Sequence, residues 1–254
     1  MEPEPRTDDP LTGRFDVWQL KSGHRYSLDD VLTAREALRA APDARRVLDL
    51  GCGIGSVLLM EADRLPEARL VGVEAQAISF ELAEANVARN GVSGRVTLVH
   101  GDLRDEAVQI AARDAGGPFD LISGTPPYMP PGTSTPSPHP QRAHARVELR
   151  GGVEDYLRAM APLLADRGRA VVCCDARSPE RALDGGRAVG LAPLRQLDAV
   201  PREGREPLFS VFTFARRGGP FVHAEPFVAR DGEGRRTEAY VTLRRFFGLP
   251  RSAS

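Results

Sequence analysis

Residues 47–56 read VLDLGCGIGS, and this stretch decides the fold. It opens with an apolar run typical of a buried strand, and the apolar residues at 57–60 have helical spacing. Glycines at 51, 53 and 55 join the two and let the backbone approach a ligand, because no Cβ intervenes. The G-x-G-x-x-G spacing of dinucleotide sites fails at Ser56. We therefore expect a site for a ligand without pyrophosphate, whose cationic end Asp49 would attract.

Apolar runs at regular intervals extend this unit along the chain. Strands are predicted at 45–50, 70–73, 96–100, 119–123, 169–174, 196–200 and 208–215, and helices from 57 and over 76–90, 153–164 and 178–189. Ser178 is expected to cap the last helix, with Pro179 at its first position. Strands that alternate with helices in this way predict an α/β protein with a doubly wound, Rossmann-like, mostly parallel sheet.

The chain is expected to form a single domain over residues 13–249. This domain would consist of an arm at 13–44, a core at 45–215 and an extension at 216–249, followed by a tail at 250–254. Residues 1–12 are rich in proline and acidic residues, so we expect them to be disordered. In the arm, Asp29 or Asp30 is expected to cap a helix before Val31. The arm would either pack on the sheet or close over the ligand.

Composition limits the partners and the compartment. The net charge is −1 and the pI is near 6.5, so the surface has no overall basic character. Lys21 is the only lysine, and the arginine excess indicates a compositional bias. Cys52, Cys173 and Cys174 lack metal-ligand spacing and are expected to be buried free thiols. Without a signal peptide or a membrane-spanning run, the chain is expected to be cytoplasmic. We expect no metal and favour a monomer, although the sequence leaves the oligomeric state open.

Two acidic residues follow the next two strands. Glu74 ends the second strand, where a carboxylate in a doubly wound fold can accept hydrogen bonds from both ribose hydroxyls. Asp102 follows the third strand and either accepts from an adenine amino group or caps the following turn. The carboxyl ends of parallel strands share one edge, so these residues are expected to lie beside the glycine turn.

Together with the glycine turn, these residues resemble the cofactor half of class I S-adenosylmethionine-dependent methyltransferases. The resemblance implies a seven-stranded sheet whose seventh strand, here 208–215, is antiparallel. It also implies that the glycine turn contacts the methionine part of the cofactor, Glu74 the ribose and Asp102 the adenine. The expected cofactor residues are Asp49, Gly51, Cys52, Gly53, Gly55, Glu74, Asp102, Leu103 and Thr125.

A second motif, SGTPPY at 123–128, follows the fourth strand. Consecutive prolines donate no backbone hydrogen bond and keep the chain extended, so their carbonyl groups stay free to accept from an amine. Tyr128 offers a flat face on which a planar group can stack. The stretch resembles the Asn/Asp-Pro-Pro-Tyr motif of amino-group methyltransferases, which implies that Thr125, Pro126, Pro127 and Tyr128 are the catalytic residues.

Other segments resemble one branch of these enzymes. Residues 24–34 (HRYSLDDVLTA), 136–146 (PSPHPQRAHAR) and 148–157 are similar to the bacterial family that methylates adenine N6 beside the anticodon of valine tRNA. This resemblance implies a tRNA partner. The proline-rich stretch 129–147 is expected to be a substrate-facing loop, with Arg142 and Arg146 as substrate-binding residues. Arginine pairs near the C-terminus either meet phosphates or are ordinary surface residues.

Thr125 departs from the motif, because its hydroxyl is shorter than an Asn side chain and rotates. Three interpretations stay open: an adenine methyltransferase that tolerates Thr, an enzyme with a different substrate, and an impaired enzyme that still binds cofactor. The substrate alternatives are a glutamine side chain or a small-molecule amine. A non-catalytic, cofactor-binding partner of RNA is the remaining alternative.

Overall fold

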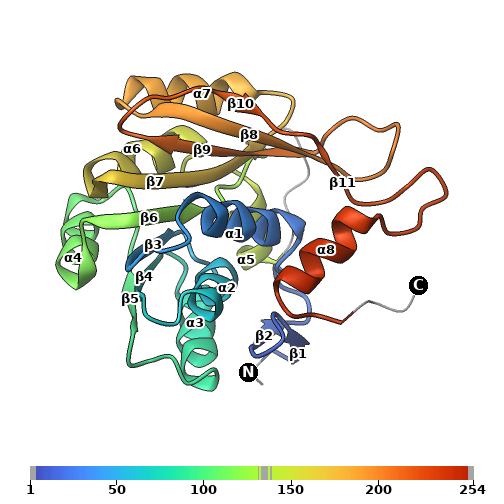
Figure 1. Ribbon diagram of the computed structural model, residues 1–254. Helices are drawn as coiled ribbons and strands as arrows, with labels where there is room; N and C mark the ends of the chain where they lie inside the picture. Colours follow the sequence, from blue (N-terminus) through green and yellow to red (C-terminus); the bar gives the residue numbers. More distant parts are fainter. Residues whose placement is uncertain (1–3, 131, 133–136, 138, 251–254) are drawn as a thin grey trace.

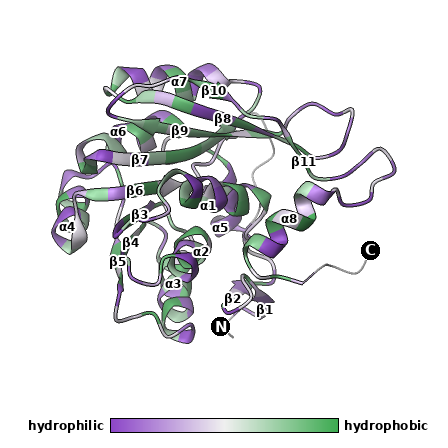
Figure 2. Ribbon diagram, in the orientation of Figure 1, coloured by the Kyte–Doolittle hydropathy of each residue, from purple (hydrophilic) through white to green (hydrophobic). Residues whose placement is uncertain are grey.

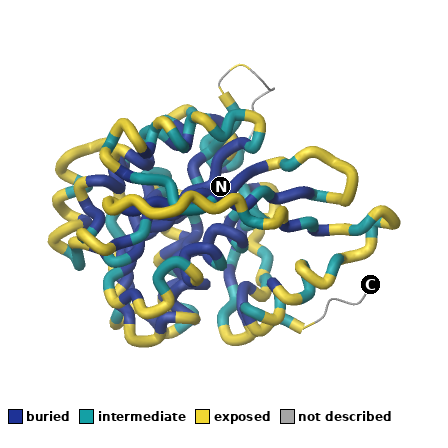
Figure 3. Tube along the Cα trace, turned by 45° about the horizontal axis from the view of Figure 1, so that its top comes forward, coloured by how far each residue is buried: buried dark blue, intermediate teal, exposed yellow. Residues whose placement is uncertain are grey.

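The computed structural model describes residues 4–130, 132, 137 and 139–250. Figure 1 shows a twisted central sheet with helices on both faces, and a small N-terminal hairpin beside the C-terminal helix. The central strands are buried, whereas the outer helices and loops carry most of the exposed residues (Figure 3). The predicted α/β architecture is confirmed.

The sheet has the predicted doubly wound order. Its main path runs β8-β9-β7-β6-β3-β4-β5, from β3 (Arg46–Leu50), β4 (Arg69–Glu74), β5 (Val96–His100), β6 (Phe119–Gly124), β7 (Leu164–Asp175), β8 (Ala192–Val200) and β9 (Phe209–Ala215). Neighbours from β7 to β5 pair in parallel, and β9 pairs antiparallel with both β7 and β8. The seven expected strands, with an antiparallel seventh, are therefore present. Two short strands, β10 (Val222–His223) and β11 (Phe227–Val228), pair with β8 and enlarge the sheet to nine strands.

The helices cover the two faces of the sheet. One face carries α1 (Leu28–Ala40), α2 (Ser56–Arg64) and α3 (Ala77–Arg89), and the other carries α4 (Glu106–Gly116), α6 (Val153–Leu163) and α7 (Pro179–Ala188). Each face has its own cluster of buried hydrophobic side chains. Figure 2 shows the apolar strands between helices whose outer surfaces are hydrophilic. All seven residues of β9 are buried, because this strand lies inside the sheet and is covered on both faces.

The caps of two helices were predicted with different success. Ser178 is the N-cap residue of α7 and Pro179 lies in its first turn, as expected, but the Ser178 side chain makes no capping hydrogen bond. The prediction that Asp29 or Asp30 caps the arm helix is wrong, because α1 begins at Leu28 and Ser27 is its N-cap. Asp30 instead completes a capping box and accepts the backbone N–H of Ser27 at 2.8 Å.

The N-terminal segment is ordered where the structure describes it. β1 (Arg6–Pro10) pairs antiparallel with β2 (Asp16–Leu20), so the prediction of disorder over residues 1–12 is wrong at Arg6–Pro10. Residues 1–3 and 251–254 lie outside the described residues. The N–H of Gly13 donates to the Phe247 carbonyl at 2.7 Å, which ties the arm to the end of α8 (Glu238–Phe246). β2 also packs on α3, since Trp18 N–H donates to Asn86 Oδ1 at 2.7 Å. The arm therefore packs on the domain.

The proline-rich stretch contains a helix. α5 (Pro140–Arg146) begins with its proline in the first turn, so the prediction of a loop over residues 129–147 is wrong for this part. Seven residues are too few to show an apolar period, which explains the error. Pro131, Pro136 and Pro138 of the predicted loop lie outside the described residues. No helix in the described part of the chain is long and apolar enough to cross a bilayer.

Candidate active site

Three neighbouring cavities lie where the carboxyl ends of the central parallel strands converge. The Asp102 cavity is lined by Glu74, Gln76, Asp102, Leu103, Arg150 and Tyr156. The glycine-turn cavity shares Gly51, Glu74 and Tyr156 with it and continues to Ser56, Asp30 and Thr125. The Tyr128 cavity, of about 270 Å³, shares Asp30 and Thr125 with the glycine-turn cavity and adds Asp29, Pro126 and Arg146. The predicted site residues from four strand ends are thus brought together along one path.

The glycine turn requires glycine. Gly51, Gly53 and Gly55 have φ angles of 65°, 57° and 87°, in the left-handed region that side chains disfavour. A Cβ on Gly51 would lie 2.1 Å from the Tyr156 hydroxyl oxygen. A Cβ on Gly53 would meet nothing within 4 Å, so the backbone there faces open space. Cys52 is buried between them, and its N–H donates to the Val73 carbonyl at 2.9 Å.

Asp49 lies behind the turn. It is 1% exposed, and its Oδ2 accepts the Leu58 N–H at 3.1 Å, inside the first turns of α2. Its Oδ1 accepts the Ser123 hydroxyl at 3.4 Å, which links β3 to β6. Burial, followed by the nearby charge of Asp30, raises the pKa of Asp49 well above its ordinary value. Asp49 does not belong to the linings of the three cavities, so its contacts shape the glycine turn.

Glu74 is held by the backbone beneath two cavities. Its carboxylate accepts the Gly53 N–H at 2.9 Å and the Gln76 N–H at 2.7 Å. Burial raises the pKa of Glu74, and these backbone hydrogen bonds oppose that shift. Each carboxylate oxygen retains a lone pair for a further donor, so Glu74 can accept two hydroxyl groups from one ligand.

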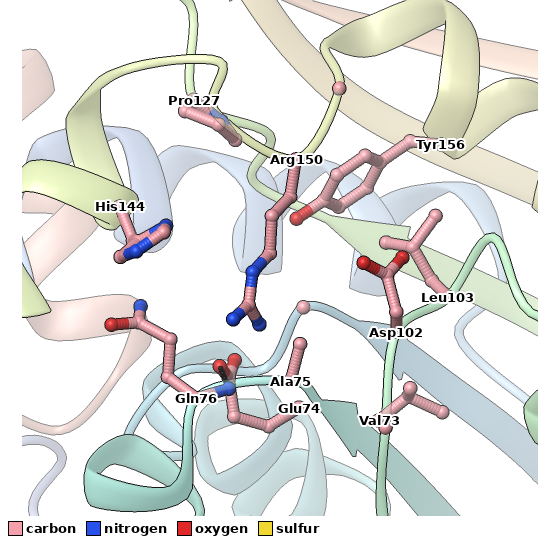
Figure 4. Close-up of a pocket in the computed structure, with 13 residues that line it drawn as sticks. Val73, Glu74, Ala75, Gln76, Asp102, Leu103, Pro127, His144, Arg150 and Tyr156 are labelled. Carbon is pink, nitrogen blue, oxygen red and sulfur yellow. Dashed lines mark hydrogen bonds between the residues drawn. The ribbon is translucent and has the colours of Figure 1, made fainter.

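Asp102 and Leu103 line the outer end of this path. The Arg104 guanidinium donates to both Asp102 oxygens, at 2.9 Å and 2.7 Å, and holds the pKa of Asp102 below its ordinary value. Figure 4 shows Glu74 and Gln76 at the lower side of the cavity, Pro127 at the upper side, and Asp102 at the right beneath Tyr156. Leu103 is 7% exposed and offers an apolar contact beside the carboxylate.

Arg150 and Tyr156 line the Asp102 cavity, although the sequence did not predict either of them for the cofactor end of the site. The Arg150 guanidinium reaches into the Asp102 cavity toward Glu74 and Gln76 (Figure 4), and its charge lowers the pKa of both Glu74 and Asp102. Tyr156 comes from α6 and is 7% exposed, and burial raises its pKa. In the sequence Tyr156 is one apolar position of an amphipathic helix, which carries no functional signal.

Thr125 directly follows β6 and forms part of the wall between the glycine-turn and Tyr128 cavities. Its hydroxyl lies 3.5 Å from Oδ1 of Asp30, a buried residue of α1. The Ser56 hydroxyl approaches the same Asp30 oxygen at 3.2 Å. Residues far apart in the sequence therefore meet at the boundary between the two cavities, and Asp30 had been predicted only as a helix cap.

The Tyr128 cavity receives the second half of the motif. Pro126 and Tyr128 line it, whereas Pro127 lines the other two cavities. Tyr128 is half-buried, its hydroxyl lies 3.4 Å from Asp29 Oδ2, and burial raises its pKa. The cavity therefore offers an aromatic ring and carboxylate oxygens to a planar group that carries an amine.

Only some of the predicted basic residues lie at the site. Arg146 lines the Tyr128 cavity and is exposed, but Arg142 donates to the Gly23 carbonyl at 3.2 Å and holds α5 against the arm. Near the C-terminus, Arg235 pairs with Asp231 and Glu233, and Arg245 pairs with Glu238. Arg216 donates to the Leu164 carbonyl at the start of β7, the end of the sheet opposite Tyr128. Arg244 instead lines a further cavity with Ser27, which also lines the Tyr128 cavity, so the C-terminal arginines differ in their distance from the site.

The predicted free thiols are confirmed, since Cys52, Cys173 and Cys174 are buried and unpaired. In the described part of the chain, no group of three or more His, Cys, Asp or Glu side chains is arranged to hold a metal ion.

Residues 31–134 match the family model described as the methyltransferase small domain. The tRNA1(Val) (adenine(37)-N6)-methyltransferase of Porphyromonas gingivalis is 34% identical over 158 residues, which are 61% of this chain and 60% of the relative. This chain thus matches less than two thirds of that protein's length. The protein of the same name from Bacteroides thetaiotaomicron is 30% identical over 208 residues, 81% of this chain and 83% of the relative.

Two further likenesses widen the comparison. The release factor glutamine methyltransferase of Geobacter sulfurreducens is 36% identical over 137 residues, 53% of this chain and 45% of that protein. Among solved structures, a predicted O-methyltransferase from Agrobacterium tumefaciens superposes with a TM-score of 0.65 at 20% identity, over 89% of this chain and 100% of that one. The last likeness supports the fold alone.

Proposed function

Because this chain belongs to the family of S-adenosylmethionine-dependent methyltransferases that contains the two tRNA1(Val) relatives, we propose that it methylates the N6 amino group of an adenine in tRNA. One observation carries the proposal. Thr125 forms a wall shared by the cavity of the glycine turn and the cavity of Tyr128. A planar amine stacked on Tyr128 would therefore meet the cofactor at this wall. A tRNA substrate would place the reaction in the cytoplasm.

The residues present fit the proposed cofactor. The open space above Gly53 leaves room for a ligand against the backbone, and the glycine turn with Thr125 would hold its methionine part. Glu74 would accept the ribose hydroxyls, and Asp102 with Leu103 would contact the adenine. When bound, the cofactor supplies a methyl group activated on a sulfonium. The structure thus offers polar and apolar partners in the order that this ligand requires.

The residues of the Tyr128 cavity would position the amine. The Pro126 and Pro127 nitrogens cannot donate, so the adjacent carbonyl groups are available as acceptors. Stacking on Tyr128 would contribute about 1–3 kcal/mol and fix the plane of the base. Positioning of this kind is a major source of rate in transfers between two bound groups.

A glutamine side chain is the second candidate substrate. The release factor glutamine methyltransferase among the relatives favours it, as does the position of Arg216 at the end of the sheet opposite Tyr128. A side-chain amide is also planar and would fit between an aromatic ring and acceptor oxygens. Adenine stays the leading proposal, because the tRNA-modifying relative covers 81% of this chain, and the release factor relative covers 53%.

The test supplies labelled S-adenosylmethionine together with either bulk tRNA or a protein extract. The proposal expects label in tRNA from the wild-type protein, and comparable or higher transfer from Thr125→Asn. Label in protein alone would select the glutamine substrate. Binding of the cofactor without transfer to either pool would overturn the enzymatic proposal.

A further inference from the structure

Asp30 has an unusual position for a charged residue. Its side chain is buried at the first turn of α1, yet it lines both the glycine-turn cavity and the Tyr128 cavity. Its Oδ2 accepts the Ser27 N–H at 2.8 Å, which fixes the carboxyl in place. Buried side-chain polar atoms usually have at least one hydrogen-bond partner, so the partners of the second oxygen of Asp30 indicate whether it can accept a further donor.

Oδ1 of Asp30 is only loosely occupied. The hydroxyl of Ser56 is 3.2 Å away and that of Thr125 is 3.5 Å away, whereas hydroxyl donors prefer about 2.7–2.8 Å. A stronger N–H donor that entered from the Tyr128 cavity would find this oxygen beside Thr125. Thr125 contributes one hydroxyl oxygen at the boundary, and Asp30 adds a second acceptor from another part of the chain.

We propose that Asp30 is a catalytic residue that accepts the substrate amino group beside Thr125 and takes the proton which that nitrogen loses. The inference rests on the proposed function and deepens it. In the step, the amine nitrogen forms a bond to the methyl carbon, and the carbon–sulfur bond of the methyl donor breaks with its electron pair going to sulfur. The nitrogen then carries an extra proton, which passes to the Asp30 carboxylate and later to water.

The surroundings of Asp30 suit a proton acceptor. Burial, followed by the charge of Asp29, raises the pKa of Asp30 to about 7, and its hydrogen bonds to Ser27, Ser56 and Thr125 act in the opposite direction. The titratable groups that interact with Asp30 electrostatically also include Asp49 from β3, Tyr128 after β6 and Cys173 from β7. The Arg146 guanidinium and His24, whose pKa is lowered by burial, line the same Tyr128 cavity.

The wild-type protein provides the first test. If the carboxylate form of Asp30 receives the proton, kcat on tRNA should rise as the pH increases through about 7 and then level off. A kcat that stays constant from pH 5.5 to 8.5 would overturn the inference without any variant. Wild-type protein that transfers no methyl group to tRNA would instead overturn the proposed function.

Asp30→Asn provides the second test, because the amide oxygen can still accept the Ser27 N–H and keep the cap. We expect kcat to fall by about 100-fold or more and the rise near neutral pH to disappear. The affinity for S-adenosylhomocysteine, measured by calorimetry, should stay within about twofold. Asp184→Asn is the matched control, since Asp184 is exposed on α7 and pairs with Arg187, and its kcat should not change.

A double-mutant cycle separates this role from a structural one. An Asn at position 125 would bring its own acceptor to the amine, so Asp30→Asn should cost less than about 10-fold in a Thr125→Asn background. Equal losses in both backgrounds would contradict the inference. So would an Asp30→Asn variant that keeps wild-type kcat but binds S-adenosylhomocysteine more than about 10-fold more weakly, because Asp30 would then serve the cofactor.

Discussion

The cofactor half and the substrate half of the site are built in different ways. Around the cofactor path, several contacts join residues close in the chain, such as Glu74 with Gln76 and Asp102 with Arg104, and Glu74 also accepts the Gly53 N–H from the preceding strand end. Around the Tyr128 cavity they join distant residues, since Thr125 and Asp30 are 95 positions apart, and Tyr128 and Asp29 are 99 positions apart. The first half is therefore visible as motifs, whereas in the second half only the SGTPPY motif is visible, and its partners on the arm reach it only after folding.

The largest expected effect is the loss of cofactor binding. In Gly51→Ala, the left-handed backbone and the contact of the new Cβ with Tyr156 should together weaken S-adenosylhomocysteine binding by more than about 100-fold. Gly204→Ala is the control, because its φ of 75° carries the same backbone cost but nothing lies within 4 Å of the new Cβ. Calorimetry on both variants tests this, and equal losses of affinity would contradict it.

The next prediction tests whether the Glu74 carboxylate binds the cofactor. Glu74→Gln keeps the size of the side chain but removes its charge, so binding of S-adenosylhomocysteine should weaken by about 10- to 100-fold. Glu84→Gln, on the exposed side of α3, should bind normally. An unchanged affinity in Glu74→Gln would show that this carboxylate only shapes the glycine turn.

A smaller effect separates the two halves. Tyr128→Ala should lower kcat/KM for tRNA by about 5- to 150-fold, which corresponds to the loss of one stacked base, and leave S-adenosylhomocysteine affinity unchanged. Tyr128→Phe retains the ring and should stay within a few-fold of wild type. Steady-state kinetics with both variants provide the measurement, and equal losses in the two would argue against stacking.

The last effect is on stability and concerns Glu61, a buried residue of α2. Burial, followed by the charge of Asp49, raises the pKa of Glu61 well above its ordinary 4.5, so the folded protein binds a proton that the unfolded chain releases. The stability contributed by this group is present below pH 4.5 and is lost as the pH rises through the folded pKa.

Glu61→Gln should therefore be more stable than wild type at pH 8, by an amount that shrinks toward pH 4.5, with a slope of at most about 1.4 kcal/mol per pH unit. Urea denaturation of both proteins at several pH values measures this difference. If the difference in unfolding free energy between Glu61→Gln and wild type did not depend on pH, ionisation of the buried Glu61 could not be its cause.

The core strands were predictable because each is a short apolar run bounded by turn residues. The elements that were missed lack such a signal: α4 buries only Ala112 fully, and α5 is too short for a period. β1 reads as a polar, proline-bounded segment, and its order comes from pairing with β2.

The residues of the site also differ in how far the sequence predicts them. Glu74 and Asp102 follow strands whose ends must converge in a doubly wound sheet, so their neighbourhood could be predicted. Asp30 and Arg150 reach the site only through the packing of α1 and the position of the chain after α5. Arg142 was predicted to bind substrate because it lies near the motif in the sequence. In the structure it instead donates to the arm at Gly23.

The central claim is methyl transfer to adenine N6 in tRNA, and the most direct measurement is nucleoside mass spectrometry of unmodified tRNA after reaction with this protein and S-adenosylmethionine. The account predicts N6-methyladenosine as the new nucleoside, and its absence from a parallel reaction with Gly51→Ala. A reaction that leaves tRNA unmodified while the same preparation methylates a glutamine side chain in protein would contradict it.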